Sequence, residues 1–415
     1  MVAMDRHDDL AVQEIPGQTG RYALPAVGVF GPNASGKSNL LDALKYMCWA
    51  VRNSHQKWNP DGPISRRPFL LDDDGPARPS EYEVDIVAEG VRYNYGFSLD
   101  DMCVREEWLY AYPEKRRRML FERTRGEPMR FGPTLTGQRK VTERAVRDNS
   151  LFLSAAYANN LESIRPIYRW FSRRCRSANT ANEQARLGTS LHLLEKHDSK
   201  AVLDLLNFAD LGVVGMSIKK LEMSKEDREK FYRVLQALEI DDTGVNLDSV
   251  SREVEIQHRT ATGPKSLDFN SESTGTRTWL SMLGPILVTL GTGSLLVVDE
   301  LDARLHPSLT AELVRLFQDP AINTKGGQLL FNSHDVTLLG GKAQFRLHRD
   351  QIWFTEKDET GGTRVYPLTE YRVREGLDNI ERSYLRGRYG ATPFFDETIL
   401  LELIQAGDIE HASGQ

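Results

Sequence analysis

One stretch of the chain constrains its fold more than any other, residues 26–44, which read AVGVFGPNASGKSNLLDAL. A short apolar run of β-type residues precedes a glycine-rich turn, and a run of helix-forming residues follows. Gly31, Gly36, Lys37 and Ser38 match the pattern G-x-x-x-x-G-K-S in this strand–loop–helix context. Glycines let the backbone curl so that successive N–H groups point at phosphate oxygens, and the following helix N-terminus adds its dipole. The stretch therefore predicts a nucleoside triphosphate site.

Two side chains of this loop have distinct expected roles. Lys37 should reach the β- and γ-phosphates, and the Ser38 hydroxyl should take one position on Mg²⁺. A glycine-rich loop with an accidental Lys-Ser pair is the alternative, which the flanking context makes much the weaker. The residues predicted to surround the nucleotide are Gly31, Pro32, Asn33, Ala34, Ser35, Gly36, Lys37, Ser38 and Asn39.

Composition bounds the class of protein. The 415 residues are 40% hydrophobic and 27% charged, which is enough apolar material for a sizeable core. The net charge of −6 argues against a surface that is basic throughout but leaves room for a local nucleic-acid patch. Cys48, Cys103 and Cys175 form no C-x-x-C pair, so a structural zinc site or a disulfide framework is not expected. With no basic, apolar leader at the N-terminus, a cytoplasmic location is expected.

An uncharged segment, Thr278–Val298, is long enough to span a bilayer. It contains Gly284, Pro285, Gly291 and Gly293, which divide it into a helix, a turn and a short strand. A buried helix followed by a central strand is the favoured interpretation. No membrane association is therefore expected.

A second motif lies at the end of that segment. The apolar run Ser294–Val298 is followed by Asp299 and Glu300, the Walker B arrangement. Asp299 is expected to hold Mg²⁺, directly or through water, and Glu300 is placed to orient or deprotonate the attacking water. A surface Asp-Glu pair at a strand end is the weaker alternative. Pro307 suits the first turn of a following helix.

Two further stretches extend the pattern. Residues 328–332 predict another strand, and His334 just beyond it could hydrogen-bond the γ-phosphate or the lytic water. A lone histidine after a strand is more often structural, but the preceding carboxylate motif favours the functional interpretation. At Ser273 and Gly275, a helix start could present N–H groups and a hydroxyl to an anion. An N-cap without a ligand explains that stretch equally well.

The texture of the chain changes along its length. Residues 59–79 predict a proline-rich loop, 81–99 a hairpin that turns at Glu89-Gly90, and 108–130 further strands. Residues 267–340 have the texture of a parallel α/β core. Amphipathic helical spacing is found across 150–240 and a last helix is expected near 397–405. The clearest helical stretches are 191–196, 201–206 and 227–238.

Taken in order, the phosphate loop, the Ser/Gly helix start, the Asp-Glu strand, the Asp302 loop and the strand with His334 resemble the ABC ATPases. The phosphate loop that runs directly into Asn39-Leu-Leu looks like the SMC/RecF branch. Further phrases resemble the compact prokaryotic RecF/OLD-like ATPases, the group with abortive-infection and restriction-linked proteins of the RloA and AbiL kind. These phrases are SESTGTR at 271–277, DELDARLHP at 299–307, NSHD at 332–335, QIWFTEKD at 351–358 and YLRGRYGA at 384–391.

The resemblance implies an α/β fold, a P-loop NTPase of the ABC/SMC head type, with a central mostly parallel sheet, an antiparallel β subdomain and a helical lid insertion. The expected domains are a phosphate-loop lobe with the β subdomain (1–150), the helical lid (151–265), a lobe with signature, Walker B and His switch (266–350) and a C-terminal strand-loop-helix extension packing on the core (351–415).

The resemblance also implies an ATP hydrolase that uses ATP and Mg²⁺. Its expected catalytic residues are Glu300 and His334, its metal ligands Ser38 and Asp299, and Asp302 is expected near the nucleotide. A head-to-tail homodimer would sandwich two ATP molecules, so that Ser273 and Gly275 of one subunit contact the γ-phosphate held by the other. Family members are associated with phage defence, sometimes beside a separate effector protein.

The chain departs from the family pattern in two places. Residues 1–25 lack the usual first strand with a Phe-Arg-Ser-type motif, which suggests a start further upstream or the absence of that strand. Residues 151–160, where the Gln-loop is expected, contain no glutamine.

Other functions fit less well. A fused nuclease is disfavoured because no Asp-x-Asp pair follows His334, although Glu356 and Asp358 flank Lys357. No Asn-Lys-x-Asp guanine motif or LSGGQ-like transporter signature occurs. The basic runs 115–118 and 173–176 leave a DNA-binding repair ATPase of RecF type open, and a nucleotide-gated scaffold with negligible turnover is the other alternative.

Overall fold

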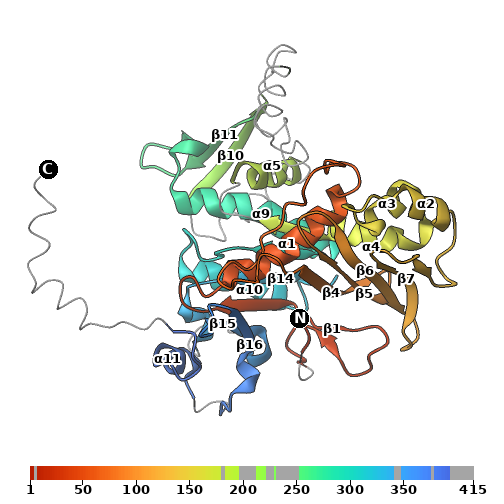
Figure 1. Cartoon of the computed structure of the whole chain (residues 1–415). Helices are drawn as coiled ribbons and strands as arrows, with labels where there is room; N and C mark the ends of the chain where they lie inside the picture. The colour runs from red at the N-terminus through yellow and green to blue at the C-terminus, as the bar shows by residue number, and fades with distance from the viewer. Residues whose placement is uncertain are drawn as a thin grey trace, which may run out of the picture.

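The computed structural model describes residues 1–3, 7–178, 183–195, 212–220, 229, 252–340, 347–374 and 378–392. Its strands form a six-stranded central sheet, a five-stranded and a three-stranded antiparallel sheet, and a two-stranded ladder (Figure 1). The predicted α/β class is confirmed.

The central sheet carries the phosphate-loop strand in its middle. Its order is β16-β15-β3-β14-β13-β9, and every pairing is parallel except β15 with β16. The residues of β3 and β13 are all buried and apolar, as expected for strands that are covered on both faces. The strands are β3 (Ala26–Phe30), β9 (Cys175–Ala178), β13 (Leu295–Val298), β14 (Gln328–Asn332), β15 (Ile352–Lys357) and β16 (Thr363–Pro367).

Long helices accompany this sheet. The segment that the sequence assigned to a helix, a turn and a strand forms α9, a left-handed Gly293 cap and β13, which confirms the prediction. None of the helices in the described residues is long and apolar enough to cross a membrane. The close contact between α9 and α5 requires Gly284, because a Cβ there would lie 2.4 Å from the Ser190 nitrogen. The helices are α1 (Lys37–Asn53), α5 (Glu183–Leu194), α9 (Thr274–Thr292) and α10 (Pro307–Gln318).

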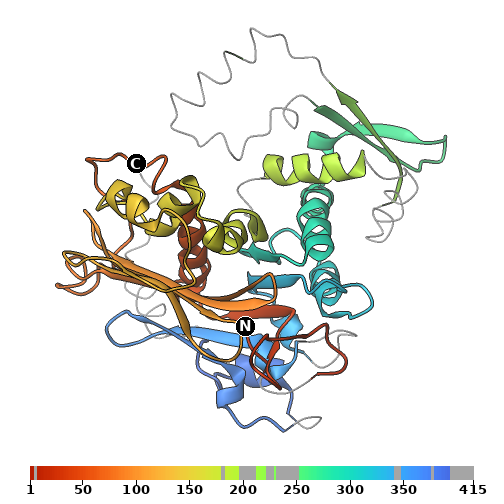
Figure 2. The ribbon, with the colours of Figure 1, turned by 90° about the vertical axis from the view of Figure 1, so that its right-hand side faces the viewer.

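The five-stranded antiparallel sheet has its own hydrophobic core, in which residues of α1 also pack. The predicted hairpin is confirmed as β4 and β5, with all of 59–79 outside helix and strand. Short helices lie against one face of this sheet (Figure 2). The elements are β4 (Ser80–Ala88), β5 (Val91–Leu99), β6 (Val104–Tyr112), β7 (Arg118–Thr124), β8 (Arg130–Phe131), α2 (Arg139–Ala145), α3 (Phe152–Ala158) and α4 (Arg165–Arg169).

A buried carboxylate joins this sheet to the segment where the Gln-loop was expected. Glu107 of β6 accepts hydrogen bonds from the backbone nitrogens of Phe152 (2.5 Å) and Leu153 (2.9 Å) at the start of α3. Burial raises the pKa of Glu107, and the Arg123 guanidinium opposes that shift. The α3 segment is therefore fixed to the sheet by an N-terminal cap from another element.

Residues 151–265, predicted as a helical lid insertion, contain strands as well as helices. Among them, β9 belongs to the central sheet, and β10 and β11 pair with β12 in the three-stranded sheet beside α5 and α9 (Figures 1 and 2). The stretch VVGMSIKK of β10 is rich in β-branched residues, so its strand propensity outweighs the helical texture of its surroundings. The helices predicted at 201–206 and 397–405, and at 227–238 apart from Glu229, lie outside the described residues. The strands are β10 (Val213–Lys220), β11 (Arg252–His258) and β12 (Lys265–Asp268).

The C-terminal part is not simply an extension that packs on the core. β15 pairs with β3 in parallel, so residues 352–367 belong to the central sheet itself. The alternation of strand and loop predicted beyond Gln351 is otherwise observed. The remaining elements are β1 (Gln13–Glu14), β2 (Tyr22–Ala23), α11 (Ile380–Leu385), one π-helical turn η2 (Trp170–Arg174) and the 3₁₀ turns η1 (Glu162–Ile164), η5 (Phe269–Ser271), η6 (Val336–Leu339), η7 (Arg349–Gln351) and η8 (Leu368–Glu370).

Candidate functional site

The loop between β3 and α1 has the close backbone contacts that its glycines predict. Gly36 is left-handed, with φ of 99°, and forms the N-cap of α1. A Cβ there would lie 2.2 Å from the Thr363 Oγ1 atom. A Cβ on Gly31 would lie 2.5 Å from the Thr355 carbonyl oxygen. Any larger residue at either position would displace the loop from the sheet.

The C-terminal hairpin formed by β15 and β16 packs against this loop. The hydroxyls of Ser35 and Thr355 lie 2.6 Å apart and are both buried. Thr355 also donates to the Phe30 carbonyl at 3.4 Å. Sequence reasoning missed Thr355 and Thr363, because their role follows from the pairing of β15 with β3. Of the predicted nucleotide contacts, Asn33, Ala34 and Asn39 are exposed, as a loop that receives a ligand requires.

Lys37 is directed back into the loop. Its ammonium donates to the carbonyls of Gly31 (2.8 Å) and Pro32 (2.9 Å), and the residue is only 6% exposed. Burial lowers the pKa of Lys37, while Asp302, Glu300 and Asp299 act in the opposite direction. A buried cation beside three carboxylates is suited to exchange its carbonyl partners for phosphate oxygens.

The two predicted metal ligands are in contact. The Ser38 hydroxyl donates to Asp299 Oδ1 at 2.9 Å. The Asn332 amide donates to the same carboxylate oxygen at 2.5 Å and lies 3.4 Å from the Ser38 hydroxyl. A hydroxyl and a carboxylate that converge on one point provide the hard oxygen donors that Mg²⁺ prefers. The donor set therefore fits the predicted metal.

Asn332 also fixes the position of Glu300. Its side-chain oxygen accepts from the Glu300 nitrogen at 2.5 Å, and its carbonyl accepts from the Leu301 nitrogen at 3.1 Å. Glu300 has a φ of 56°, a left-handed conformation that is unusual for a residue with a side chain. Its side chain is exposed immediately after the buried strand β13. Asn332 therefore holds both Asp299 and Glu300 in place at the carboxyl end of β13. The sequence did not predict this role.

Asp302 and His334 are brought together, as their order in the sequence suggested. The backbone nitrogen of His334 donates to both carboxylate oxygens of Asp302, at 3.2 and 3.3 Å. The His334 side chain is exposed. In this chain Asp302 thus positions the backbone of the histidine loop, and its proposed contact with nucleotide stays a prediction.

The helix start at Ser273 is confirmed, and the phosphate contact predicted for it stays a prediction. The Ser273 hydroxyl caps α9 by accepting from the Thr276 nitrogen at 3.1 Å. Ser273 is exposed, and the position of a Cβ on Gly275 would lie 3.3 Å from the Arg304 carbonyl oxygen. The start of α9 therefore borders the loop that follows β13.

The two acidic residues considered for a nuclease have structural partners. Glu356 accepts from the Tyr366 hydroxyl at 3.0 Å. Asp358 accepts from the nitrogens of Thr360 and Gly362 within its own turn, at 2.9 and 2.7 Å. These contacts account for both carboxylates without a metal.

The chain was compared with protein families, curated proteins and solved structures. The sequence profile of a family described as "AAA domain, putative AbiEii toxin, Type IV TA system" matches residues 27–340, about three quarters of the chain. No curated protein matched the chain. Solved structures did match, among them a crystal structure of the SMC head bound to the C-winged helix domain of ScpA. That chain is 12% identical with a TM-score of 0.33, and the match covers 83% of this chain and 90% of the other.

Proposed function

Because the chain belongs to this AAA-domain family, we propose that it binds ATP with Mg²⁺ at the phosphate loop and hydrolyses it. The observation that carries the proposal is the 2.9 Å hydrogen bond from Ser38 to Asp299, which joins residues 261 positions apart in the sequence. These two residues would hold Mg²⁺, which neutralises charge on the β- and γ-phosphate oxygens when it is bound. The N–H groups of the loop and the Lys37 ammonium bind the phosphates.

The residues after β13 and β14 have the catalytic roles in this proposal. Glu300 accepts a proton from the attacking water, and its position is set by the hydrogen bond from its nitrogen to Asn332. His334 contacts the γ-phosphate or the lytic water from the adjacent loop, whose backbone Asp302 holds. These groups follow the carboxyl ends of β13 and β14. That location supports the proposal, because ligands of parallel α/β sheets bind beyond the carboxyl ends of the strands.

The exposed start of α9 supports a second part of the proposal. Ser273 and Gly275 of one subunit close the ATP site of another, so that ATP drives dimerisation. The family's description names a toxin of a toxin–antitoxin system. We propose that the ATP-driven dimer is a switch in phage defence and acts with a separate effector protein.

The test is Glu300→Gln. We expect steady-state phosphate release to fall at least about 100-fold, because the amide cannot accept the proton. ATP affinity should be retained, and ATP should trap a dimer that is detectable by light scattering. Glu106→Gln, a change at an exposed position on β6, is the matched control and should leave turnover unchanged. If the Glu300 variant hydrolyses ATP as fast as the parent, Glu300 is not the base.

One observation favours a second candidate, a DNA-binding ATPase. The basic run Lys115–Arg118 lies at the turn between β6 and β7, and all four residues are exposed. Arg117 lies over the Tyr110 ring at 4.4 Å. DNA binding that weakens steeply with salt and is lost on changing Arg116 and Arg117 to Ala would support it.

A further inference from the structure

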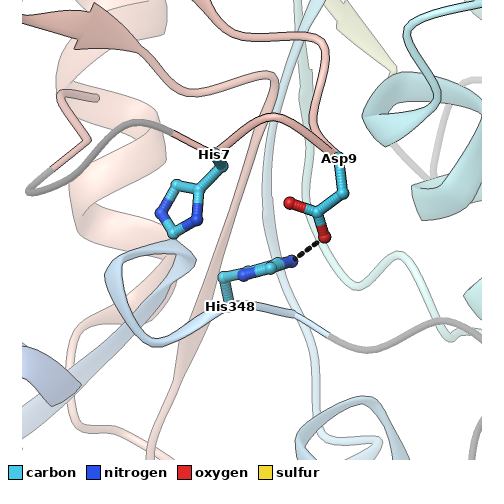
Figure 3. Close-up of side chains that lie close together, drawn as sticks. All are labelled: His7, Asp9 and His348. Carbon is cyan, nitrogen blue, oxygen red and sulfur yellow. Dashed lines mark ion pairs between the residues drawn. The ribbon is translucent and has the colours of Figure 1, made fainter.

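A cluster of two histidines and two carboxylates lies where the N-terminal segment meets the entry to β15. His7 and Asp9 come from the N-terminal segment, whereas His348 comes from the connection that leads through η7 into β15 (Figure 3). Asp350 lies in η7 itself. His7 and Asp350 are separated by 343 positions in the sequence. The fold, and no local motif, brings these side chains together.

The contacts within the cluster are short. His348 Nε2 lies 3.0 Å from Asp9 Oδ2, and His7 Nε2 lies 2.8 Å from Asp350 Oδ2. The two imidazole rings have centroids 4.6 Å apart, at 61° to one another. One ligand atom from each of His7, Asp9 and His348 lies within 4.8 Å of the others, the one group of three His, Cys, Asp or Glu side chains in the described residues that is close enough to share a metal ion.

We propose that His7, Asp9 and His348 form a binding site for Zn²⁺. Imidazole nitrogen with one carboxylate oxygen is a donor set that zinc accepts, and three protein ligands leave a fourth position for water. With zinc–ligand bonds near 2.1 Å, tetrahedral ligand atoms lie about 3.4 Å apart. The three ligand atoms lie within 4.8 Å of one another, so zinc binding would draw them closer by roughly 1.4 Å at most. The Asp9 side chain is 67% exposed and has room to move.

Asp350 has a separate role in this site. Its side chain is only 5% exposed, and as a carboxylate it accepts the proton of His7 Nε2. The other ring nitrogen of His7, Nδ1, then carries the lone pair that a metal requires. This carboxylate–histidine arrangement is the outer-shell partner that orients zinc-binding histidines in proteins. Asp350 is therefore a positioning residue and not a ligand.

The site would add a metal link between two segments that already pack together, since Trp353 of β15 lies against the cluster of Ala3 and Leu24. Leu10 and Ala11 are buried, and the Ala11 nitrogen donates to the Gln318 carbonyl at 2.7 Å. On the other side, the Gln351 amide donates to the Ala26 carbonyl at the start of β3, at 3.1 Å. Zinc would fasten the N-terminal segment to the start of β15, beside the strand that leads to the phosphate loop.

The experiment uses the full chain without an affinity tag, stripped with a chelator and kept in excess Mg²⁺. Titration with Zn²⁺, followed by calorimetry and elemental analysis, should show one zinc bound per chain. Co²⁺ in place of zinc should give visible absorption bands of a four-coordinate site. The double variant His7→Gln/His348→Gln should lose that zinc and the cobalt bands, while its circular dichroism and ATP turnover stay those of the parent.

Two further variants decide the assignment. Asp350→Asn should weaken zinc affinity by about 10- to 100-fold, the usual effect of removing such a partner. His258→Gln is the matched control, since His258 pairs with the Glu272 carboxylate at 2.6 Å without a second histidine. It should leave zinc binding unchanged. The proposal is overturned if the parent binds no zinc, if the double variant binds as much as the parent, or if the control loses it.

Discussion

The two ends of the central sheet carry comparable sets of polar groups. At the carboxyl end, Ser38, Asp299 and Asn332 are linked by hydrogen bonds next to the phosphate loop. At the amino end, Gln351 links Ala26 to Gln318, which donates to it at 2.8 Å. Both Asn332 and Gln351 are buried amides, 1% and 0% exposed. The difference lies in what surrounds them.

Strand direction explains that difference. In a parallel sheet the loops at the carboxyl ends are where ligands bind, because helices start there with free N–H groups. At the amino end, the polar groups of Gln318, Gln351 and Ala26 bond to one another. In the proposed function, buried amides of the same kind would position catalytic groups at one end, whereas at the other end Gln351 holds Ala26 and Gln318 together.

The largest expected effect is a difference in kcat between variants of the two buried amides, Asn332 and Gln351. Asn332→Ala removes the acceptor of the Glu300 nitrogen and the donor to Asp299, so we expect kcat for ATP hydrolysis to fall about 100-fold, the effect of displacing catalytic groups by roughly an ångström. Gln351→Ala removes as many hydrogen bonds and should cost about 1–3 kcal/mol in free energy of unfolding. Its kcat should change less than about threefold. Steady-state phosphate release and urea unfolding measure both.

Equal losses of kcat in the two variants would contradict the distinction between the ends. If kcat for Asn332→Ala, calculated per folded molecule, equals that of the parent, the carboxyl end of the sheet does not have the proposed catalytic role. Retained affinity for ATP in the Asn332 variant, measured by calorimetry, identifies a loss in the chemical step.

The motifs of the carboxyl end could be predicted because each is contiguous. In each motif the functional residues follow an apolar strand within a few positions, as Gly36-Lys37-Ser38 and Asp299-Glu300 do. The residue types and the secondary structure that gives them meaning can therefore be read from one short stretch. The role of Asn332 could not be predicted in this way, because its bond to Glu300 depends on the pairing of β13 with β14. The cluster of His7 and His348 joins segments more than 300 residues apart, so no local spacing predicts it.

Strand pairing accounts for the parts of the fold that the sequence did not predict. Isolated strands of four to eight residues within a helical context, such as β9 and β10, carry little periodic signal of their own. The placement of β15 next to β3 depends on contacts between distant segments. The contacts of Thr355 and Thr363 with the phosphate loop could not be predicted either, because they depend on the pairing of β15 with β3.

An intermediate effect tests these contacts with the phosphate loop. Gly36→Ala places a methyl group 2.2 Å from Thr363 Oγ1 at a φ of 99°, and we expect a loss of about 2–4 kcal/mol in free energy of unfolding from overpacking and backbone strain together. Adding Thr363→Ala should recover most of the steric part, because it removes the Oγ1 and Cγ2 atoms at 2.2 and 2.8 Å and leaves only the Cβ at 3.0 Å. About 1–2 kcal/mol should then remain. Urea unfolding gives both values.

Gly90 offers the matched control for backbone strain alone. Its φ is 77°, and a Cβ there would meet no atom within 4 Å. Gly90→Ala should therefore cost only about 1 kcal/mol. If Gly36→Ala costs no more than Gly90→Ala, the hairpin of β15 and β16 does not hold the loop.

The smallest effect concerns the pH dependence of stability at the carboxyl end. Burial lowers the pKa of Lys37 below its ordinary value of 10.5, although Asp302, Glu300 and Asp299 oppose the shift. Between the folded pKa and 10.5 the unfolded chain holds a proton that the folded chain has released, so this residue makes stability rise with pH. The slope cannot exceed about 1.4 kcal/mol per pH unit, the contribution of one proton. Lys37→Met should remove that rise from urea unfolding curves recorded between pH 8 and 10.5. The double variant His7→Gln/His348→Gln changes only the amino end and should keep it, and a slope unchanged in Lys37→Met would show that Lys37 is not the group that titrates.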